Sequence, residues 1–247
     1  MDPHMDVNVI CMKWGTKYDP HYVNRLYAMV KRNLTLPFRF VCFTDDGTGI
    51  REEVDVLPLP SMDLPEGIPE RGWNKLATFG EQLGDLEGKA IFLDLDVVIV
   101  DNMDCFFDDQ REFSIIKDYH RRNAARSIGN SSVYRFEIGR HPEVLDYFRH
   151  NFDQVRATHR NEQAYLSDQM KQKGVLQFWP ESWCPSFKHH CIPRGPMSLL
   201  REPACPDGAK IVVFHGDPNP PEAIEGRRSK FMRFMRPTPW IKDYWRE

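Results

Sequence analysis

Two aspartates separated by a single leucine, Asp94 and Asp96, are the residues whose types and spacing most clearly indicate chemistry in this 247-residue chain. They directly follow the apolar run 90–93, where a strand would leave a sheet. Carboxylate oxygens are the ligands that hard divalent cations such as Mg²⁺ and Mn²⁺ prefer. Such a cation bridges two phosphates and offsets charge on a leaving diphosphate. The pair therefore predicts a metal site for a substrate that carries phosphate.

The sequence before Asp94 predicts a strand–helix–strand unit that would position this pair. Residues 7–12 form a short apolar run, and Asp19 followed by Pro20 is typical of a helix start. Residues 38–44, rich in aromatic and β-branched side chains, predict the next strand. A crossover of this length favours a right-handed βαβ unit and a parallel sheet, so the expected fold class is α/β.

Further elements are expected along the rest of the chain from the spacing of apolar residues. The predicted strands are 90–93, which we expect to be central, 113–116, 132–134 and 211–214. The predicted helices are a short one through Leu76, Phe79 and Leu83, one that opens at His141-Pro142 and carries Val144, Leu145, Phe148 and Phe152, and one over Asn161–Lys171. We expect residues 1–6 to be a cloning remnant or tail and residues 7–247 to form one catalytic domain.

The composition excludes several broad classes of function. The formal charge of −3 gives no general attraction to nucleic acid, and no apolar stretch approaches the roughly 20 residues that cross a bilayer. We therefore expect a cytoplasmic protein that binds no nucleic acid. The six cysteines are scattered, which disfavours a disulfide framework. The cluster from Cys184 to Cys191, with His189 and His190, lacks the two close-spaced ligand pairs usual in structural zinc sites.

Residues 91–107 resemble the nucleotide-sugar-binding segment of GT-A-fold glycosyltransferases, most closely glycosyltransferase family 8, the glycogenin and bacterial galactosyltransferase group. Three later blocks follow in the order of that family: Gly129–Val133, Glu162–Leu166 and Val212–Gly216. The resemblance implies a Rossmann-like GT-A fold, a mixed and mostly parallel sheet flanked by helices. Residues 7–110 would be the nucleotide-binding half, 111–216 the sugar and acceptor half, and 217–247 a C-terminal tail.

The function implied by this resemblance is metal-dependent transfer of a sugar from a nucleotide-diphosphate sugar. UDP is the nucleotide that the likeness favours, and Mn²⁺ or Mg²⁺ is the expected cofactor. The acceptor would be a saccharide or a lipid-linked saccharide, in the synthesis of a cell-surface polysaccharide. The donor and acceptor sugars themselves are not readable from the sequence.

The resemblance also assigns residues to the metal and to the transferred sugar. It implies that Asp94, Asp96 and His215 coordinate the metal and that Asn130 and Gln163 lie near the sugar. His215 has independent support, because a neutral imidazole is a good ligand for Mn²⁺ and it follows a predicted strand.

The stereochemical outcome stays open at this point. If the family 8 likeness holds, the anomeric configuration is retained and Gln163 positions the sugar. An inverting enzyme would instead need a carboxylate as general base, and Asp118 and Glu162 are the candidates. Glu162 also stands where the family has an aspartate.

The nucleotide is expected on the first strand-to-helix loop, which carries Trp14, Gly15 and Tyr18. Tyr18 would stack on the base or else cover the end of a helix. Asp45 would accept a hydrogen bond from base or ribose, or form a turn without a ligand. Lys75 opens a short helix and suits a phosphate, although most lysines on such helices are simply solvated.

The chain departs from the family pattern after His215. Family 8 has a Lys-Pro-Trp element there, whereas this chain reads Asp217-Pro218-Asn219-Pro220. Another cation would have to serve the leaving diphosphate: Lys188, Arg227 or Arg228. The basic and aromatic run from Arg227 to Arg236, with Trp240 and Trp245 beyond, would close over the diphosphate or contact an anionic membrane surface. As we favour, it would instead form a terminal helix whose aromatic side chains pack on the core.

Two other functions fit part of the pattern. The segment 91–100 also resembles the motif of haloacid-dehalogenase-type phosphohydrolases, in which Asp94 would be a nucleophile and Asp96 a general acid/base. That motif normally lies on the first strand of its domain, whereas a βαβ unit precedes it here. A non-catalytic nucleotide-sugar-binding protein on the same fold is the third alternative.

Overall fold

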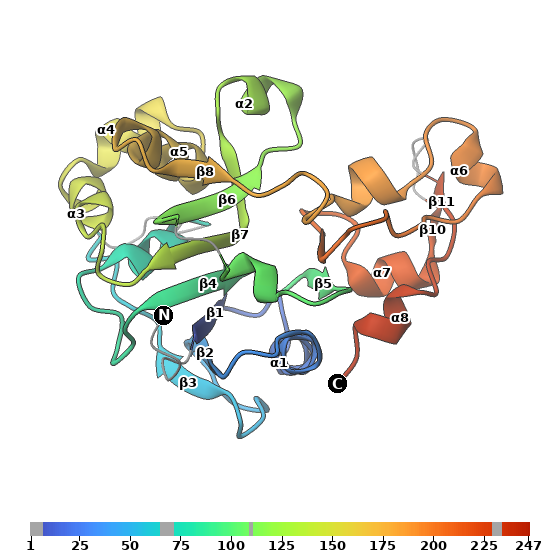
Figure 1. The fold of residues 1–247 in the computed structure, drawn as a ribbon, viewed down its shortest axis with the longest axis horizontal. Coiled ribbons are helices and arrows are strands. Elements are labelled where there is room, and N and C mark those ends of the chain that lie inside the picture. Colours follow the sequence, from blue (N-terminus) through green and yellow to red (C-terminus); the bar gives the residue numbers. More distant parts are fainter. Residues whose placement is uncertain (1–6, 65–71, 109–110, 229–233) are drawn as a thin grey trace.

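The computed structural model describes residues 7–64, 72–108, 111–228 and 234–247, and Figure 1 shows their arrangement. Seven strands form the main sheet: β1 (Val7–Lys13), β2 (Phe38–Thr44), β3 (Asp55–Pro58), β4 (Lys89–Leu93), β6 (Phe113–Lys117), β7 (Gly129–Glu137) and β8 (Leu176–Phe178). Two small sheets pair β5 (Val97–Ile99) with β9 (Ile211–Val213), and β10 (Arg227–Arg228) with β11 (Phe234–Met235).

The helices cover both faces of the main sheet. They are α1 (Pro20–Asn33), α2 (Arg121–Ala125), α3 (Glu143–His150), α4 (Phe152–Thr158), α5 (Glu162–Gln172), α6 (Met197–Leu200), α7 (Pro220–Glu225), α8 (Ile241–Tyr244), the 3-10 helices η1 (Trp73–Phe79) and η2 (Asp104–Phe106), and the π-helical turn η3 (Phe187–Cys191). In Figure 1, α1 lies on one side of the sheet and α3 to α5 on the other. No helix in the described ranges has the length and apolar character needed to span a bilayer.

The main sheet has the order β3-β2-β1-β4-β7-β6-β8. Its neighbours pair in parallel except for β7, which runs antiparallel to both β4 and β6. This is the mixed, mostly parallel sheet flanked by helices that the sequence predicted, with β4 in its centre. Because β4 lies between β1 and β7, the residues that leave its carboxyl end emerge in the middle of the sheet edge.

The alternation of side chains along the strands divides the interior into two cores. In β1, Val9 and Cys11 point to one core and Ile10 and Met12 to the other, as the period of two requires. The first core also contains the buried face of α1 and the β5–β9 pair, and the second contains η1 and the helices α3 to α5. Both faces of β4 are therefore buried, which holds its end rigidly.

Local sequence rules explain how the first βαβ unit forms. Asp19 caps α1 by accepting a hydrogen bond from the backbone N–H of His21, and Pro20 occupies the first turn. The side chains of Val23 and Leu26 on its apolar stripe are completely buried. Both flanking strands were predicted within one residue of their observed bounds, and the helix begins at Pro20 as predicted.

Three expectations about helices were wrong. Leu83 lies beyond η1, in a bridge with Leu86, because Gly80 ends the helix. The helix after Pro142 breaks at Asn151, so Phe152 begins a separate helix, although it still packs in the same core.

The expected C-terminal helix is also wrong in extent. A short antiparallel pair, β10–β11, replaces its first part, and only Ile241–Tyr244 are helical. Two of the C-terminal aromatic side chains pack inward as expected: Trp245 is buried against Tyr22, and Trp240 packs partly buried on the first core, whereas Tyr244 is exposed. Residues 1–6 and 229–233, which carry the predicted tail and part of the basic run, lie outside the described residues.

Candidate active site

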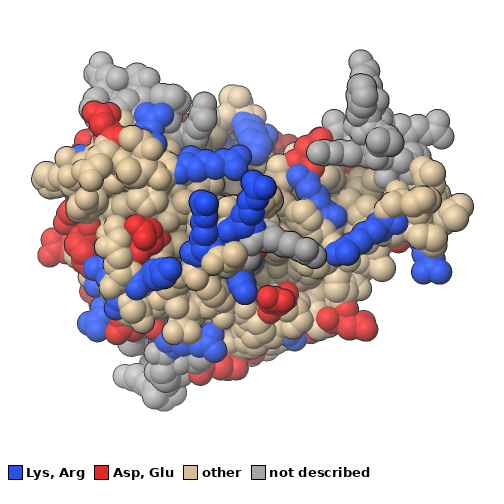
Figure 2. Space-filling view, turned by 90° about the horizontal axis from the view of Figure 1, so that it is seen from above, with Lys and Arg blue, Asp and Glu red and all other residues tan. Residues whose placement is uncertain are grey.

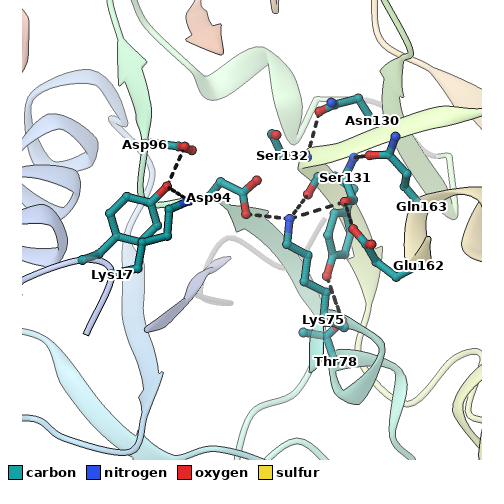
Figure 3. Close-up of polar contacts among 12 residues, drawn as sticks. Lys17, Lys75, Thr78, Asp94, Asp96, Asn130, Ser131, Ser132, Glu162 and Gln163 are labelled. Carbon is teal, nitrogen blue, oxygen red and sulfur yellow. Dashed lines mark hydrogen bonds and ion pairs between the residues drawn. The ribbon is translucent and has the colours of Figure 1, made fainter. Parts of the chain in front are cut away.

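Asp94 and Asp96 lie at the carboxyl end of β4, in the centre of the sheet edge (Figure 3). The backbone N–H of Asp94 donates to the carbonyl of Ser132 on the neighbouring strand β7 at 2.9 Å. One Asp94 oxygen lies 2.6 Å from the ammonium group of Lys75. Asp96 is buried and accepts a 2.8 Å hydrogen bond from the hydroxyl of Tyr18. The two predicted carboxylates therefore face two different partners from two different elements.

Lys75 is a buried cation that pairs with Asp94. It is held by its own helix, because the Thr78 hydroxyl donates to the Lys75 carbonyl and also contacts Tyr134 of β7. Burial alone would lower the pKa of Lys75, but the Asp94 and Glu162 carboxylates outweigh it and the pKa is raised. Lys75 is thus a buried positive charge inside the site and not a solvated lysine, and its pairing with Asp94 was not predicted from the sequence.

The environment keeps Lys75 charged, but it disfavours the charged form of Asp96. Burial and the nearby Asp94 carboxylate raise the pKa of Asp96 well above the usual range, against the opposing effects of Tyr18, Lys17 and Lys75. A raised carboxyl pKa means that the negative charge is poorly compensated at this position. A cation placed beside Asp96 would remove that cost.

A second group of polar side chains continues the site from Lys75 toward α5 (Figure 3). Lys75 donates to the carbonyl of Ser131 at 3.3 Å and contacts its hydroxyl at 3.4 Å. The Ser131 hydroxyl donates to Glu162 at 2.8 Å, and the Ser131 backbone N–H donates to the side-chain oxygen of Gln163 at 3.4 Å. The start of α5 is thereby tied to the start of β7, next to Asp94.

The other predicted sugar-site residues belong to the same group. The amide nitrogen of Gln163 donates to Asp118 at 3.1 Å, and Asp118 also accepts from Asn123. Asn130 is buried and accepts from the backbone N–H of Ser132 at 3.0 Å. The structure therefore brings Asp94, Lys75, Asn130, Glu162, Gln163 and Asp118 together through shared partners.

His215 lies on a different segment but reaches the same region through the β5–β9 pair. Val97 of β5 pairs with Val213 of β9. Asp96, just before Val97, and His215, two residues after Val213, therefore lie on neighbouring segments. Its imidazole, however, contacts the Ser186 hydroxyl at 2.7 Å and stacks on Tyr119. Burial, with Lys188 and His189, lowers the pKa of His215 to about 4, so the ring is neutral near pH 7.

The donor set fits a hard or borderline cation in its chemistry, with two carboxylates and one neutral imidazole. Within the described ranges, no three His, Cys, Asp or Glu side chains converge closely enough to hold an ion. The Asp94 and Asp96 carboxylates are engaged by Lys75 and Tyr18, and the imidazole of His215 by Ser186. The three-ligand metal site thus remains a prediction.

The residues predicted for the nucleotide lie on two adjacent loops. The backbone N–H of Gly15 donates to the Asp45 carboxylate at 2.8 Å, which joins the loop after β1 to the loop after β2. Trp14 packs against the second core. Tyr18 packs on Tyr22 and directs its hydroxyl to Asp96. The loop with Trp14, Gly15 and Tyr18 therefore adjoins the carboxylate pair.

Several residues of the site were missed from the sequence. Ser131 connects Lys75 to both Glu162 and Gln163, and its only signal was its place in the block after Asn130. Ser186 and Tyr119 hold His215, and no local pattern marks either of them.

Comparisons with known proteins place this architecture in the GT-A class, the fold of a large group of glycosyltransferases. One match is the galactosyltransferase LgtC in complex with donor and acceptor sugar analogues, at 13% identity and a TM-score of 0.58, covering 86% of this chain and 88% of that chain. No protein-family model matches the chain, and no curated protein matches it.

Two further solved structures share the fold. The glycosyltransferase GlyE of Streptococcus pneumoniae TIGR4 matches at 13% identity and a TM-score of 0.58, over 98% of this chain and 60% of that chain. The bifunctional glycosyltransferase WbbM matches at 12% identity and a TM-score of 0.55, over 88% of this chain and 47% of that chain. At these identities the likeness establishes the GT-A fold that the sequence predicted.

Proposed function

We propose that this chain is a metal-dependent glycosyltransferase that moves a sugar from a nucleotide-diphosphate sugar to a saccharide or lipid-linked saccharide. The observation that carries the proposal is the position of Asp94 and Asp96. They emerge at the middle of the sheet edge of a GT-A fold, between the loop that carries Tyr18 and the group formed by Lys75, Ser131 and Glu162. Ligands of open α/β sheets bind at this edge.

Asp94, Asp96 and Lys75 would together contribute to binding the diphosphate. A bound Mn²⁺ or Mg²⁺ would supply positive charge that stabilises the leaving diphosphate. Asp94, Asp96 and His215 are the residues that would hold it, and the high pKa of Asp96 supports a cation there. Lys75, fixed by η1, would keep the Asp94 carboxylate oriented toward the substrate.

The group around Gln163 supports a sugar-positioning role for that residue. Its amide is oriented by the Ser131 backbone and by Asp118. Glu162 is buried with one oxygen bonded to Ser131, which makes it a poor general base for a hydroxyl that arrives from solvent. We therefore propose that the configuration of the transferred sugar is retained, with Asp118 holding the amide of Gln163.

The alternatives find less support. A phosphohydrolase with Asp94 as nucleophile would carry this motif on its first strand, whereas β1, β2 and β3 all precede β4 here. A non-catalytic nucleotide-sugar-binding protein would use the two carboxylates and the buried Lys75 for binding alone. Such a protein would release no nucleoside diphosphate from a donor, so measuring that release distinguishes it from an enzyme.

The proposal is tested by the slow hydrolysis of a donor in the absence of acceptor. Purified protein incubated with UDP-glucose, UDP-galactose or GDP-mannose and Mn²⁺ is expected to release the nucleoside diphosphate, and a chelator is expected to stop the release. The Asp94→Asn and Asp96→Asn variants should lose on the order of a hundredfold in rate, because the cation would lose a charged ligand.

The matched control is Asp101→Asn, on the same segment, where the carboxylate pairs with Lys210 at the surface. This variant should hydrolyse donor at the wild-type rate. Release that is unaffected by chelator, or an equal loss in all three variants, would contradict the proposed function.

A further inference from the structure

A groove with cationic walls leads away from the candidate active site along α5. It has a volume of about 620 Å³ and lies between α5 and the loop of residues 123–128. On α5 it is lined from Gln163 to Lys171 by residues that share one helical face. From Gln163 to Lys171 the helix rises roughly 12 Å, enough for a short saccharide. The end of the groove at Gln163 is the end that would meet the transferred sugar.

Hydrogen bonds fix the two walls of the groove to each other. The backbone N–H of Gly129 donates to the hydroxyl of Ser167 at 2.8 Å, and that hydroxyl donates to the Gln163 carbonyl at 2.6 Å. On the opposite wall the N–H groups of Arg126 and Ile128 both donate to the carbonyl of Asn123. The groove is therefore part of the folded structure, built on β7 and α5.

The charges that line the groove are unbalanced. Arg126, Arg160 and Lys171 are exposed in it, and within the described ranges none of these three side chains has an ion pair or hydrogen bond. The carboxylate in the lining, Asp168, is bonded by His159 at 3.3 Å and by Gln172 at 2.9 Å.

This concentration of positive charge stands out because the chain as a whole carries a formal charge of −3. Figure 2 looks down on the face that carries α2 in Figure 1 and shows Lys and Arg side chains gathered across its middle. Cations beside a groove that have no protein partner bind anionic groups of a ligand through charge-assisted hydrogen bonds. Arg126 and Arg160 can each bind such a group through two parallel N–H donors.

We propose that this groove is the acceptor subsite and that it selects a saccharide that bears an anionic group, a carboxylate or a phosphate. The inference rests on the proposed function, because it takes Gln163 as the reacting end of the groove. The anionic group would lie near Arg126 and Lys171, and the hydroxyl that receives the sugar would lie at Gln163. A neutral acceptor would leave these cations without a partner.

The test is a ligand-observed NMR titration of the wild-type protein at low salt with glucose 1-phosphate, glucuronic acid and glucose. We expect at least one of the two anionic sugars to bind about tenfold more tightly than glucose. Preference for glucose 1-phosphate identifies a phosphorylated acceptor, and preference for glucuronic acid identifies a uronic acid. Equal binding of all three sugars would overturn the inference.

A variant ties the binding to the groove rather than to the donor site. The double variant Arg126→Gln, Lys171→Gln should bind the preferred anionic sugar about tenfold more weakly than wild type. Lys242→Gln, an exposed lysine on α8, is the control and should bind it as wild type does. If the double variant bound as tightly as the control, the groove would not be the subsite.

Nucleotide binding separates this inference from the proposed function. If the wild-type protein binds UDP in Mn²⁺ but shows no preference for an anionic sugar, the inference fails and the proposed function stands. If it binds the anionic sugar through Arg126 and Lys171 but no nucleotide in any divalent metal, the proposed function fails, and the interpretation of the groove as its acceptor subsite fails with it.

Discussion

Lys75 and Asp94 illustrate how the site depends on single residues. The side chains are only 11% and 24% exposed, and the ammonium group lies 2.6 Å from the carboxylate. Removing one partner of a buried ion pair leaves the other charge without compensation in a medium of low polarity.

We expect Lys75→Met to lower the free energy of unfolding by about 2 kcal/mol, less than for a fully buried pair because Asp94 retains some solvent contact. Chemical denaturation followed by circular dichroism measures this change. The matched control is Lys210→Met, which removes a pair of the same 2.6 Å length whose carboxylate is 53% exposed. That change should cost less than about 1 kcal/mol. Equal effects of the two substitutions would mean that the Lys75 pair is not effectively buried.

The sequence could predict Asp94 and Asp96 because their signal is local: an apolar run that becomes charged at its end. The sequence could not predict which side chains contact these two carboxylates. Lys75 is 19 positions before Asp94, and their contact depends on how η1 packs against β7. Tyr18 illustrates the same limit, since its hydroxyl bonds the carboxylate of Asp96, 78 positions later in the chain. Such pairs are set by tertiary packing, which no local pattern encodes.

At the scale of elements, the turn at Gly226 holds the C-terminal segment against the rest of the molecule. Its backbone has φ 77° and ψ 157°, a conformation that essentially only glycine adopts. A Cβ atom there would lie 2.6 Å from the backbone nitrogen of Pro237. A side chain at this position therefore displaces the backbone of the segment that leads to α8.

We expect Gly226→Ala to lower the free energy of unfolding by about 3 kcal/mol, from the backbone conformation and the clash together. Gly174→Ala is the control, because Gly174 has a similar φ of 73° but a Cβ atom there would meet nothing within 4 Å. It should cost only about 1 kcal/mol. Thermal unfolding of both variants measures the difference, and equal losses would argue against the close packing of the C-terminal segment.

Elements that follow their own sequence pattern were predicted well, and elements that depend on distant partners were not. The strands 7–13 and 38–44 and the helix between them carry caps and periodic apolar residues. By contrast, β8 has three residues and exists because it pairs with β6. The segment 211–214 was predicted as a strand and forms β9 over 211–213, but its partner, β5, was not predicted. That pairing brings the His215 segment next to the carboxylates.

At the scale of the whole molecule, the sheet order accounts for the meeting of residues that are far apart in sequence. β4 in the centre brings Asp94 between the loop after β1, where we expect the nucleotide, and the residues on β7 and α5 that we propose for the sugar. The fold class was predictable from the βαβ unit and the resemblance in four sequence blocks. The groove along α5 was not, because its walls come from segments whose approach is set by the Gly129–Ser167 hydrogen bond.

The most direct test of the central claim is calorimetric titration of the wild-type protein and of Asp96→Asn with UDP-sugars and GDP-sugars, with and without Mn²⁺. We predict that one nucleotide sugar binds the wild type only with the metal, and that Asp96→Asn binds it at least about tenfold more weakly. No binding of any nucleotide sugar in any metal, or equal binding by Asp96→Asn and wild type, would contradict the account.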